Sequence, residues 1–148
     1  MINGGVTWVL LADGRRARVL VEAKRGGAVA EQAAWEISED ELYDPRDRPP
    51  RSYDSAGVGR HAMDGGVDLH EEEEKKFLKR VAGELSDACQ AHAFDHLVIA
   101  APPRALGLLR SALPDAVRRK IQTETAKDLL SETGEAVRAR LKEWRLPG

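Results

Sequence analysis

The sequence predicts an α/β fold, a mixed β-sheet of about five strands flanked by helices. Strand-like alternation and apolar runs fill the first 37 residues, whereas a period of 3.6 residues begins near residue 69. The elements follow the order β-β-β, long loop, α-β-α-β-α. A meander followed by crossover units of this kind gives a mixed sheet with helices packed on it. The 148 residues suit one domain, 1–148.

Three consecutive strands are expected over residues 6–13, 16–22 and 28–37. The first is a continuous apolar run, as in a well-buried strand. In the second, small apolar residues alternate with charged ones, so Glu22 is expected on the polar face together with Arg16 and Arg18. Gly14 and the pair Gly26-Gly27 mark the two turns.

The second half of the sequence predicts three helices, one short helical piece and two strands. Residues 69–91 carry the stripe of an amphipathic helix, and residues 97–101 form a short apolar run typical of a central strand. Pro103 suits the first turn of the next helix. A short helical piece at 115–119 precedes a strand at 121–125, and either Ser131 or Thr133 can cap the last helix.

Between these halves, residues 39–66 carry prolines and glycines without an apolar period, which predicts a long loop. The loop ends in Gly65-Gly66, immediately before a helix start. Asp68 is expected to cap that helix, with Glu71 completing a capping box. The sequence therefore predicts a flexible diglycine tip held on a rigid helix.

Composition narrows the class of protein. The formal net charge of −2 argues against strong sequence-independent binding of nucleic acid. The single cysteine, Cys89, excludes an internal disulfide framework and favours a reducing compartment. The N-terminus shows no signal peptide, and the apolar runs are too short to span a bilayer. We expect a cytoplasmic protein with no membrane association.

The loop contains the best candidates for nucleic-acid contact. Guanidinium groups, hydroxyls and an aromatic ring suit phosphate contact and base stacking. The candidate residues are Arg51, Tyr53, Arg60, His61, Gly65 and Gly66.

A second group of residues resembles a loose set of metal ligands or acid–base groups. It comprises Asp64, Asp68, His70 and Glu71, with His61 nearby. The spacing matches no metal motif, so we predict no metal and no cofactor. His61, His70 and Asp68 remain the candidates for a catalytic role.

Several stretches of the sequence resemble the bacterial host attachment proteins and follow the same order along the chain. This family is described as required for attachment to host cells. The stretches are Trp8 to Leu20, Arg51 to Gly57, Gly59 to Met63, Asp68-x-His70-Glu71 and Lys127-Asp128-Leu129. The resemblance covers nearly the whole chain.

That family is similar in turn to the middle domain of archaeal and eukaryotic peptide-chain release factors. The resemblance implies a fold shared with translational components, in which a Gly-Gly-Gln loop enters the ribosomal peptidyl-transferase centre and a long helix follows. Gly65 and Gly66 occupy the comparable place, but Val67 stands where the release factors have Gln. The hydrolytic activity is therefore not carried over.

We interpret the chain as a non-enzymatic binding protein with RNA or the ribosome as partner, contacted through residues 46–66, and with an indirect role in attachment. One alternative is a hydrolase acting on an RNA-linked or phosphate ester, with His61 or His70 as general base. The other is an exported surface adhesin. The oligomeric state is left open by the sequence.

Overall fold

The structure, a computed structural model, describes residues 5–37 and 59–145, and over residues 59–69 it describes the backbone alone. The described chain forms one five-stranded mixed sheet with the strand order β3-β2-β1-β4-β5. The strands are β1 (Thr7–Ala12), β2 (Arg16–Glu22), β3 (Val29–Glu36), β4 (His96–Ala100) and β5 (Ile121–Thr125). The predicted fold class is confirmed.

The meander and the crossovers pair as the sequence predicts. β1 pairs antiparallel with β2, and β2 pairs antiparallel with β3. β4 pairs parallel with both β1 and β5. The apolar run at 97–101 therefore lies inside the sheet, where both of its faces are covered.

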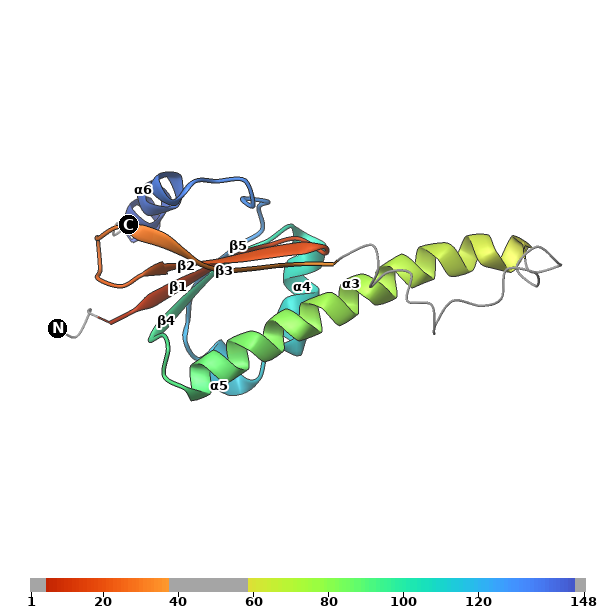
Figure 1. The fold of residues 1–148 in the computed structure, drawn as a ribbon, viewed down its shortest axis with the longest axis horizontal. Coiled ribbons are helices and arrows are strands. Elements are labelled where there is room, and N and C mark those ends of the chain that lie inside the picture. Colours follow the sequence, from red (N-terminus) through yellow and green to blue (C-terminus); the bar gives the residue numbers. More distant parts are fainter. Residues whose placement is uncertain (1–4, 38–58, 146–148) are drawn as a thin grey trace.

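Helices cover the two faces unequally (Figure 1). The helices α3 (Gly59–Gln90), α4 (Pro103–Ala112) and α5 (Asp115–Arg118) lie on one face, and α6 (Gly134–Trp144) lies on the other. The larger core contains Leu10, Phe77, Leu85 and Leu97 beneath α3 and α4. The smaller core joins Val9, Val98 and Leu141 beneath α6. The result is a three-layer body.

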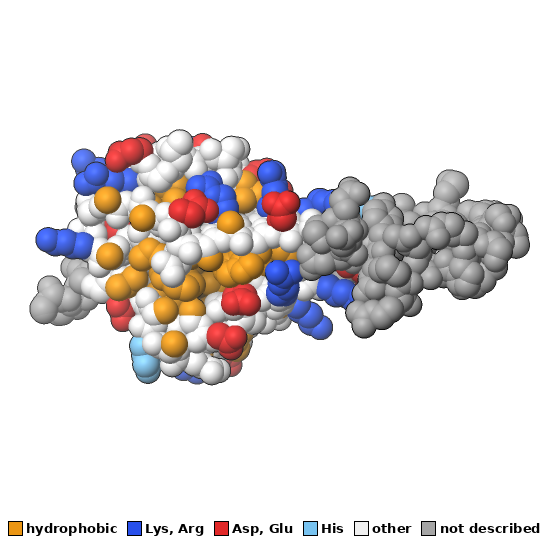
Figure 2. Space-filling model, in the orientation of Figure 1, with side chains coloured by type: hydrophobic (Ala, Val, Ile, Leu, Met, Phe, Trp, Pro, Cys, Tyr) orange, Lys and Arg blue, Asp and Glu red, His pale blue; other side chains and the backbone are white. Residues whose placement is uncertain are grey.

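β3 is one of the two edge strands of the sheet and is only partly covered. Its positions are half-buried or exposed, and Trp35 and Ile37 pack against the larger core. Apolar side chains form a band along this side of the body (Figure 2).

The predicted helix start at residues 68–69 is wrong. α3 begins at Gly59 and spans 32 residues, so it includes Gly65, Gly66 and the expected cap Asp68. The capping-box spacing also fits a helix interior, because residues three apart lie on one face there. Two helical glycines cost about 1 kcal/mol each relative to alanine, which a long run of better helix formers can offset.

The predicted loop over 39–66 is accordingly wrong from residue 59 onward. Residues 38–58 lie outside the described part of the chain. The diglycine pair is part of a helix and does not form a loop tip, so a glycine-specific backbone conformation is not needed at this site.

The last helix shows which of its two possible caps is used. Thr133 is extended, and its Oγ1 accepts a hydrogen bond of 3.1 Å from the backbone N–H of Ala136. Ser131 is not the N-cap residue.

Candidate functional site

The sequence-predicted contact residues are distributed over two parts of the chain. Arg51 and Tyr53 lie outside the described residues. Arg60 and His61 lie in the first turn of α3, and Gly65 and Gly66 lie one to two turns further on. The structure describes the backbone of these helical positions and not their side chains, so their role in contact remains a prediction.

The candidate acid–base residues are spread along the same helix. His61 and His70 are separated by about 14 Å along the axis, since each residue of an α-helix advances 1.5 Å. The two candidate bases therefore cannot act together on one small group. His70 is exposed and has no hydrogen-bond or ion-pair partner among the described residues.

The neighbouring carboxylate has a structural partner. Glu71 pairs with Arg104 at the start of α4, with a distance of 3.3 Å between Oε2 and Nη2. Among the described residues, no three His, Cys, Asp or Glu side chains come together in a way that could hold a metal ion.

α3 is anchored to the body through its C-terminal half. Among the side chains of α3 that the structure describes, those of residues 70–90, the buried ones lie between Phe77 and Cys89. From residue 70 to residue 76, each side chain is exposed or half-buried. The N-terminal half continues away from the sheet and projects beyond it (Figure 1). Over 32 residues the helix is about 48 Å long. We call residues 59–76 the projecting half of α3.

Charge is distributed unevenly along the sequence. Residues 38–74 contain twelve Asp and Glu against four Arg, whereas the whole chain has a net charge of −2. The remaining residues therefore carry a clear cationic surplus. The surplus begins immediately at the base of the projecting half, in the sequence Lys75-Lys76 and Lys79-Arg80.

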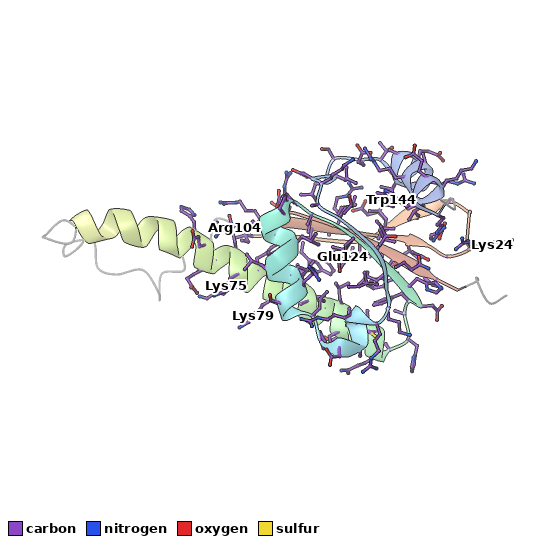
Figure 3. The ribbon with its side chains drawn as sticks, turned by 180° about the vertical axis from the view of Figure 1, so that it is seen from behind. Lys24, Lys75, Lys79, Arg104, Glu124 and Trp144 are labelled. Carbon is purple, nitrogen blue, oxygen red and sulfur yellow. The ribbon has the colours of Figure 1, made fainter. Side chains whose placement is uncertain are left out.

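Three cationic side chains surround the crossing of α3 and α4. Lys75 and Lys79 extend from α3, and Arg104 extends from α4 beside them (Figure 3). All three are exposed. We call Lys75, Lys79 and Arg104 the basic crossing. It lies where the projecting half of α3 joins the body.

A buried ion pair, which sequence reasoning missed, lies on the opposite side of the sheet. Glu22 is 1% exposed, so the polar face of β2 on which it is expected is covered at this position. Arg145 at the end of α6 donates to both carboxylate oxygens, at 2.7 Å and 2.8 Å. The backbone N–H of Gly26 donates to the same carboxylate, and Arg145 also donates to Thr7. The alternation in β2 placed Glu22 on the correct face, but α6 covers that face.

The pair affects the acidity of Glu22. Burial alone would raise the pKa of its carboxyl, since the charged form loses hydration. The hydrogen bonds from Arg145 and Gly26, together with the positive charge of Arg145, outweigh burial and hold the pKa below its usual value of 4.5.

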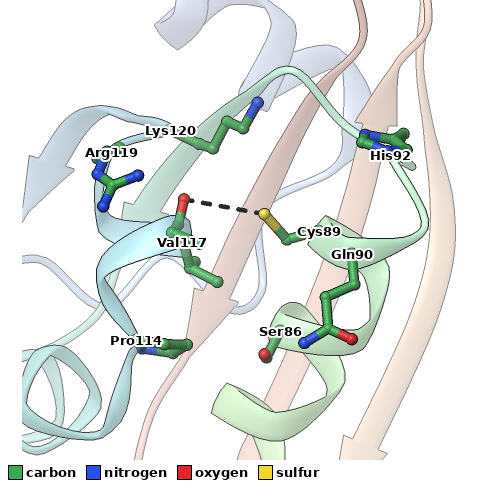
Figure 4. Close-up of a pocket in the computed structure, with 9 residues that line it drawn as sticks. Ser86, Cys89, Gln90, His92, Pro114, Val117, Arg119 and Lys120 are labelled. Carbon is green, nitrogen blue, oxygen red and sulfur yellow. Dashed lines mark hydrogen bonds between the residues drawn. The ribbon is translucent and has the colours of Figure 1, made fainter.

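A groove at the far end of α3 contains the only cysteine of the chain. It has a volume of about 460 Å³ and lies between α3 and α5, with Ser86, Gln90 and Arg119 around its mouth (Figure 4). The Sγ of Cys89 is 3.8 Å from the backbone oxygen of Ala116. Cys89 is buried and belongs to the larger core. It acts there as a small apolar side chain.

A known protein family matches most of this chain. The model of a family described as "Protein required for attachment to host cells" matches residues 8–141. This chain belongs to that host attachment family. None of the curated proteins matches it.

Two residues in the stretches that resemble the host attachment family, Asp13 and Asp128, form hydrogen bonds that stabilise the fold. The Oδ1 of Asp13 accepts from the backbone N–H groups of Arg15 and Arg16, which shapes the β1–β2 turn. The Oδ1 of Asp128 accepts from the N–H of Leu130 at 3.1 Å. Both interactions stabilise loops that follow the C-terminal ends of strands, β1 in the first case and β5 in the second.

Arg18 connects two parts of the fold. Its guanidinium donates to the backbone oxygens of Leu130 and Glu132 and pairs with Glu31 on β3. It thus ties the segment before α6 to the meander. Gly14 lies beside α3 in the β1–β2 turn: a Cβ there would meet Cδ of Glu74 at 2.7 Å and would displace the flexible end of that side chain.

A solved structure supports the fold expected of the host attachment domain. The chain is similar to an archaeal translation termination factor, aRF1, with a TM-score of 0.50 and 10% sequence identity. The match covers 95% of this chain and 40% of the release factor, so the chain spans less than half of that protein. The similarity shows a shared fold.

The helices were also compared with the requirements of a membrane span. None of those in the described ranges, including α3, combines the length and the apolar character that crossing a bilayer requires.

Proposed function

We propose that this host attachment domain is a non-enzymatic binding protein that contacts RNA, with ribosomal RNA as its target, through the projecting half of α3 and the basic crossing. The observation that carries the proposal is the shape of α3. A helix of 32 residues packs on the body through its C-terminal half and extends beyond it with the rest. A projecting helix can enter a recess that the globular body cannot.

The basic crossing supplies the electrostatic part of the proposal. Lys75, Lys79 and Arg104 are positioned to meet a phosphate backbone running past the base of the projection. Arg104, at the start of α4, also pairs with Glu71 at 3.3 Å. Arg51, Tyr53, Arg60 and His61 remain proposed contacts.

The acidic surplus of residues 38–74 limits the affinity of such a contact. It opposes a diffuse attraction to RNA, so binding depends on a few cationic groups at defined positions. We therefore expect modest affinity, and a preference for a structured RNA recess over plain duplex RNA.

Binding to purified ribosomes by sedimentation tests the proposal. We expect Lys75→Ala/Lys79→Ala and Arg51→Ala/Arg60→Ala each to weaken binding, and to lower the slope of log K against log salt by about 1 for each phosphate that the variant no longer neutralises. The matched control is Lys24→Ala/Arg119→Ala, which removes the same charge from exposed positions on the body. Equal binding by all three variants and the wild type would contradict the proposal.

The alternatives predict other outcomes. Ester hydrolysis that is lost in His61→Ala or His70→Ala would favour the hydrolase. Recovery of the protein in the outer surface fraction of cells would favour the adhesin. Under the proposal, fractionation recovers the protein from the cytoplasm, and its effect on attachment is indirect.

A further inference from the structure

A second cationic feature lies at the end of the body opposite the projecting half of α3. A shallow pocket of about 510 Å³ lies between α6 and the β2–β3 turn. Lys and Arg side chains gather at this end of the molecule (Figure 2). The charged residues that line the pocket are Glu22, Arg25, Glu135, Arg138, Lys142 and Arg145.

Two of the arginines are fixed in place by interactions of their own. Arg138 donates to the backbone oxygen of Gly26, from Nη2 at 2.8 Å and from Nε at 3.2 Å. Arg145 is held by its two hydrogen bonds to Glu22. A ligand that meets these groups does not have to order them, so little conformational entropy is lost on binding.

The other two cationic side chains of the pocket, those of Arg25 and Lys142, are available to a ligand. Arg25 and Lys142 are exposed, and neither has an ion-pair or hydrogen-bond partner among the described residues. Of the two carboxylates that line the pocket, that of Glu22 forms an ion pair with Arg145. Glu135 lies 3.8 Å from Arg138 and is itself exposed. The lining therefore has a surplus of two positive charges over negative ones.

One buried donor in the pocket wall lacks an acceptor. The Nε–H of Arg145 is buried and has no hydrogen-bond partner among the described residues, although both Nη atoms of the same guanidinium are used. A buried charged donor without an acceptor is destabilising. An anionic oxygen in the pocket would satisfy it after a movement of the side chains that cover the Nε atom.

We propose that this pocket binds a phosphate group. A phosphate dianion matches the charge surplus, and its oxygens can accept simultaneously from an arginine edge and from flexible cationic side chains. In this arrangement the Nε–H of Arg145 faces one oxygen, while Arg25 and Lys142 close over the others. The ligand is inorganic phosphate or the phosphate monoester of a small molecule. This proposal is independent of the RNA contact, which uses the other end of the body.

The Nε–H resonance of Arg145 in an NMR titration tests the proposal directly. We expect inorganic phosphate to shift it saturably, and NaCl at the same ionic strength to leave it in place. Arg25→Ala/Lys142→Ala should weaken phosphate binding by about tenfold or more, since charge-assisted hydrogen bonds are removed. The matched control Arg119→Ala/Lys127→Ala removes the same charge from exposed positions elsewhere and should bind as the wild type does.

Two further ligands distinguish the source of the phosphate. Tighter binding of adenosine 5′-monophosphate than of inorganic phosphate would indicate a monoester ligand, and equal binding would indicate free phosphate. Adenosine should not shift the resonance. The proposal is overturned if adenosine shifts it as well as the monophosphate does, if NaCl reproduces the phosphate effect, or if the double variant binds phosphate as tightly as its control.

Discussion

The carboxylate of Glu22 and the guanidinium of Arg145 meet end to end, 2.7 Å and 2.8 Å apart, although 123 positions separate them in the chain. Glu22 ends β2 and Arg145 follows the last turn of α6, so the pair fixes the end of the final helix to the sheet. A carboxylate that is 1% exposed retains its charge because three donors surround it. This pair has a direct consequence for stability.

Replacing Glu22 with Gln is expected to destabilise the protein by about 3 kcal/mol at neutral pH, because it leaves Arg145 buried without its counter-charge. The pKa of Glu22 is lowered by folding, so its stabilising contribution is present above the unfolded value of 4.5 and is lost as pH falls through the folded value. The difference in unfolding free energy between wild type and Glu22→Gln should therefore shrink below pH 4.5.

Urea unfolding from pH 7 downward measures this difference. Glu143→Gln on the exposed side of α6 is the matched control, and its difference from the wild type should stay small and flat. A difference for Glu22→Gln that is equally independent of pH would contradict the assigned role of the pair.

The choice between two possible caps gives a second prediction. Thr133→Ala should destabilise the protein by about 1 kcal/mol, because the N–H of Ala136 loses its acceptor. Ser131→Ala, which removes a hydroxyl two residues earlier, should stay within about 0.5 kcal/mol of the wild type. Chemical denaturation of both variants under one condition decides which hydroxyl is the cap.

The position of Gly65 and Gly66 inside α3 gives a third prediction. Gly65→Ala/Gly66→Ala should stabilise the projecting half of α3 locally, by about 1 kcal/mol for each position. The expected result is slower amide hydrogen exchange around residues 67–75 and a stronger helical signal in circular dichroism. Unchanged exchange and an unchanged spectrum would indicate that these glycines are not helical.

Gly83 offers the control for this experiment. It lies in the half of α3 that packs on the body, and a Cβ there would meet no atom within 4 Å. Gly83→Ala should therefore raise the stability of the whole domain and leave exchange in the projecting half unaffected.

The sequence by itself determined the elements whose signal is local. The alternation in β2, the apolar run at 97–101 and the stripe from Phe77 to Cys89 each predict an element and its buried face, because burial repeats with the period of the backbone. These patterns also fix the order of strands and helices, and with it the mixed sheet.

Only the tertiary structure decided where α3 begins and what Glu22 contacts. A capping pattern at Asp68 is a local signal, and a helix that continues through it overrides that signal at a cost of about 1 kcal/mol per glycine. The partner of Glu22 could not be read from β2, because it lies at the other end of the chain and is brought there by α6 packing across the sheet. Periodicity reports which face is covered, whereas the identity of the covering residue is a long-range property of the fold.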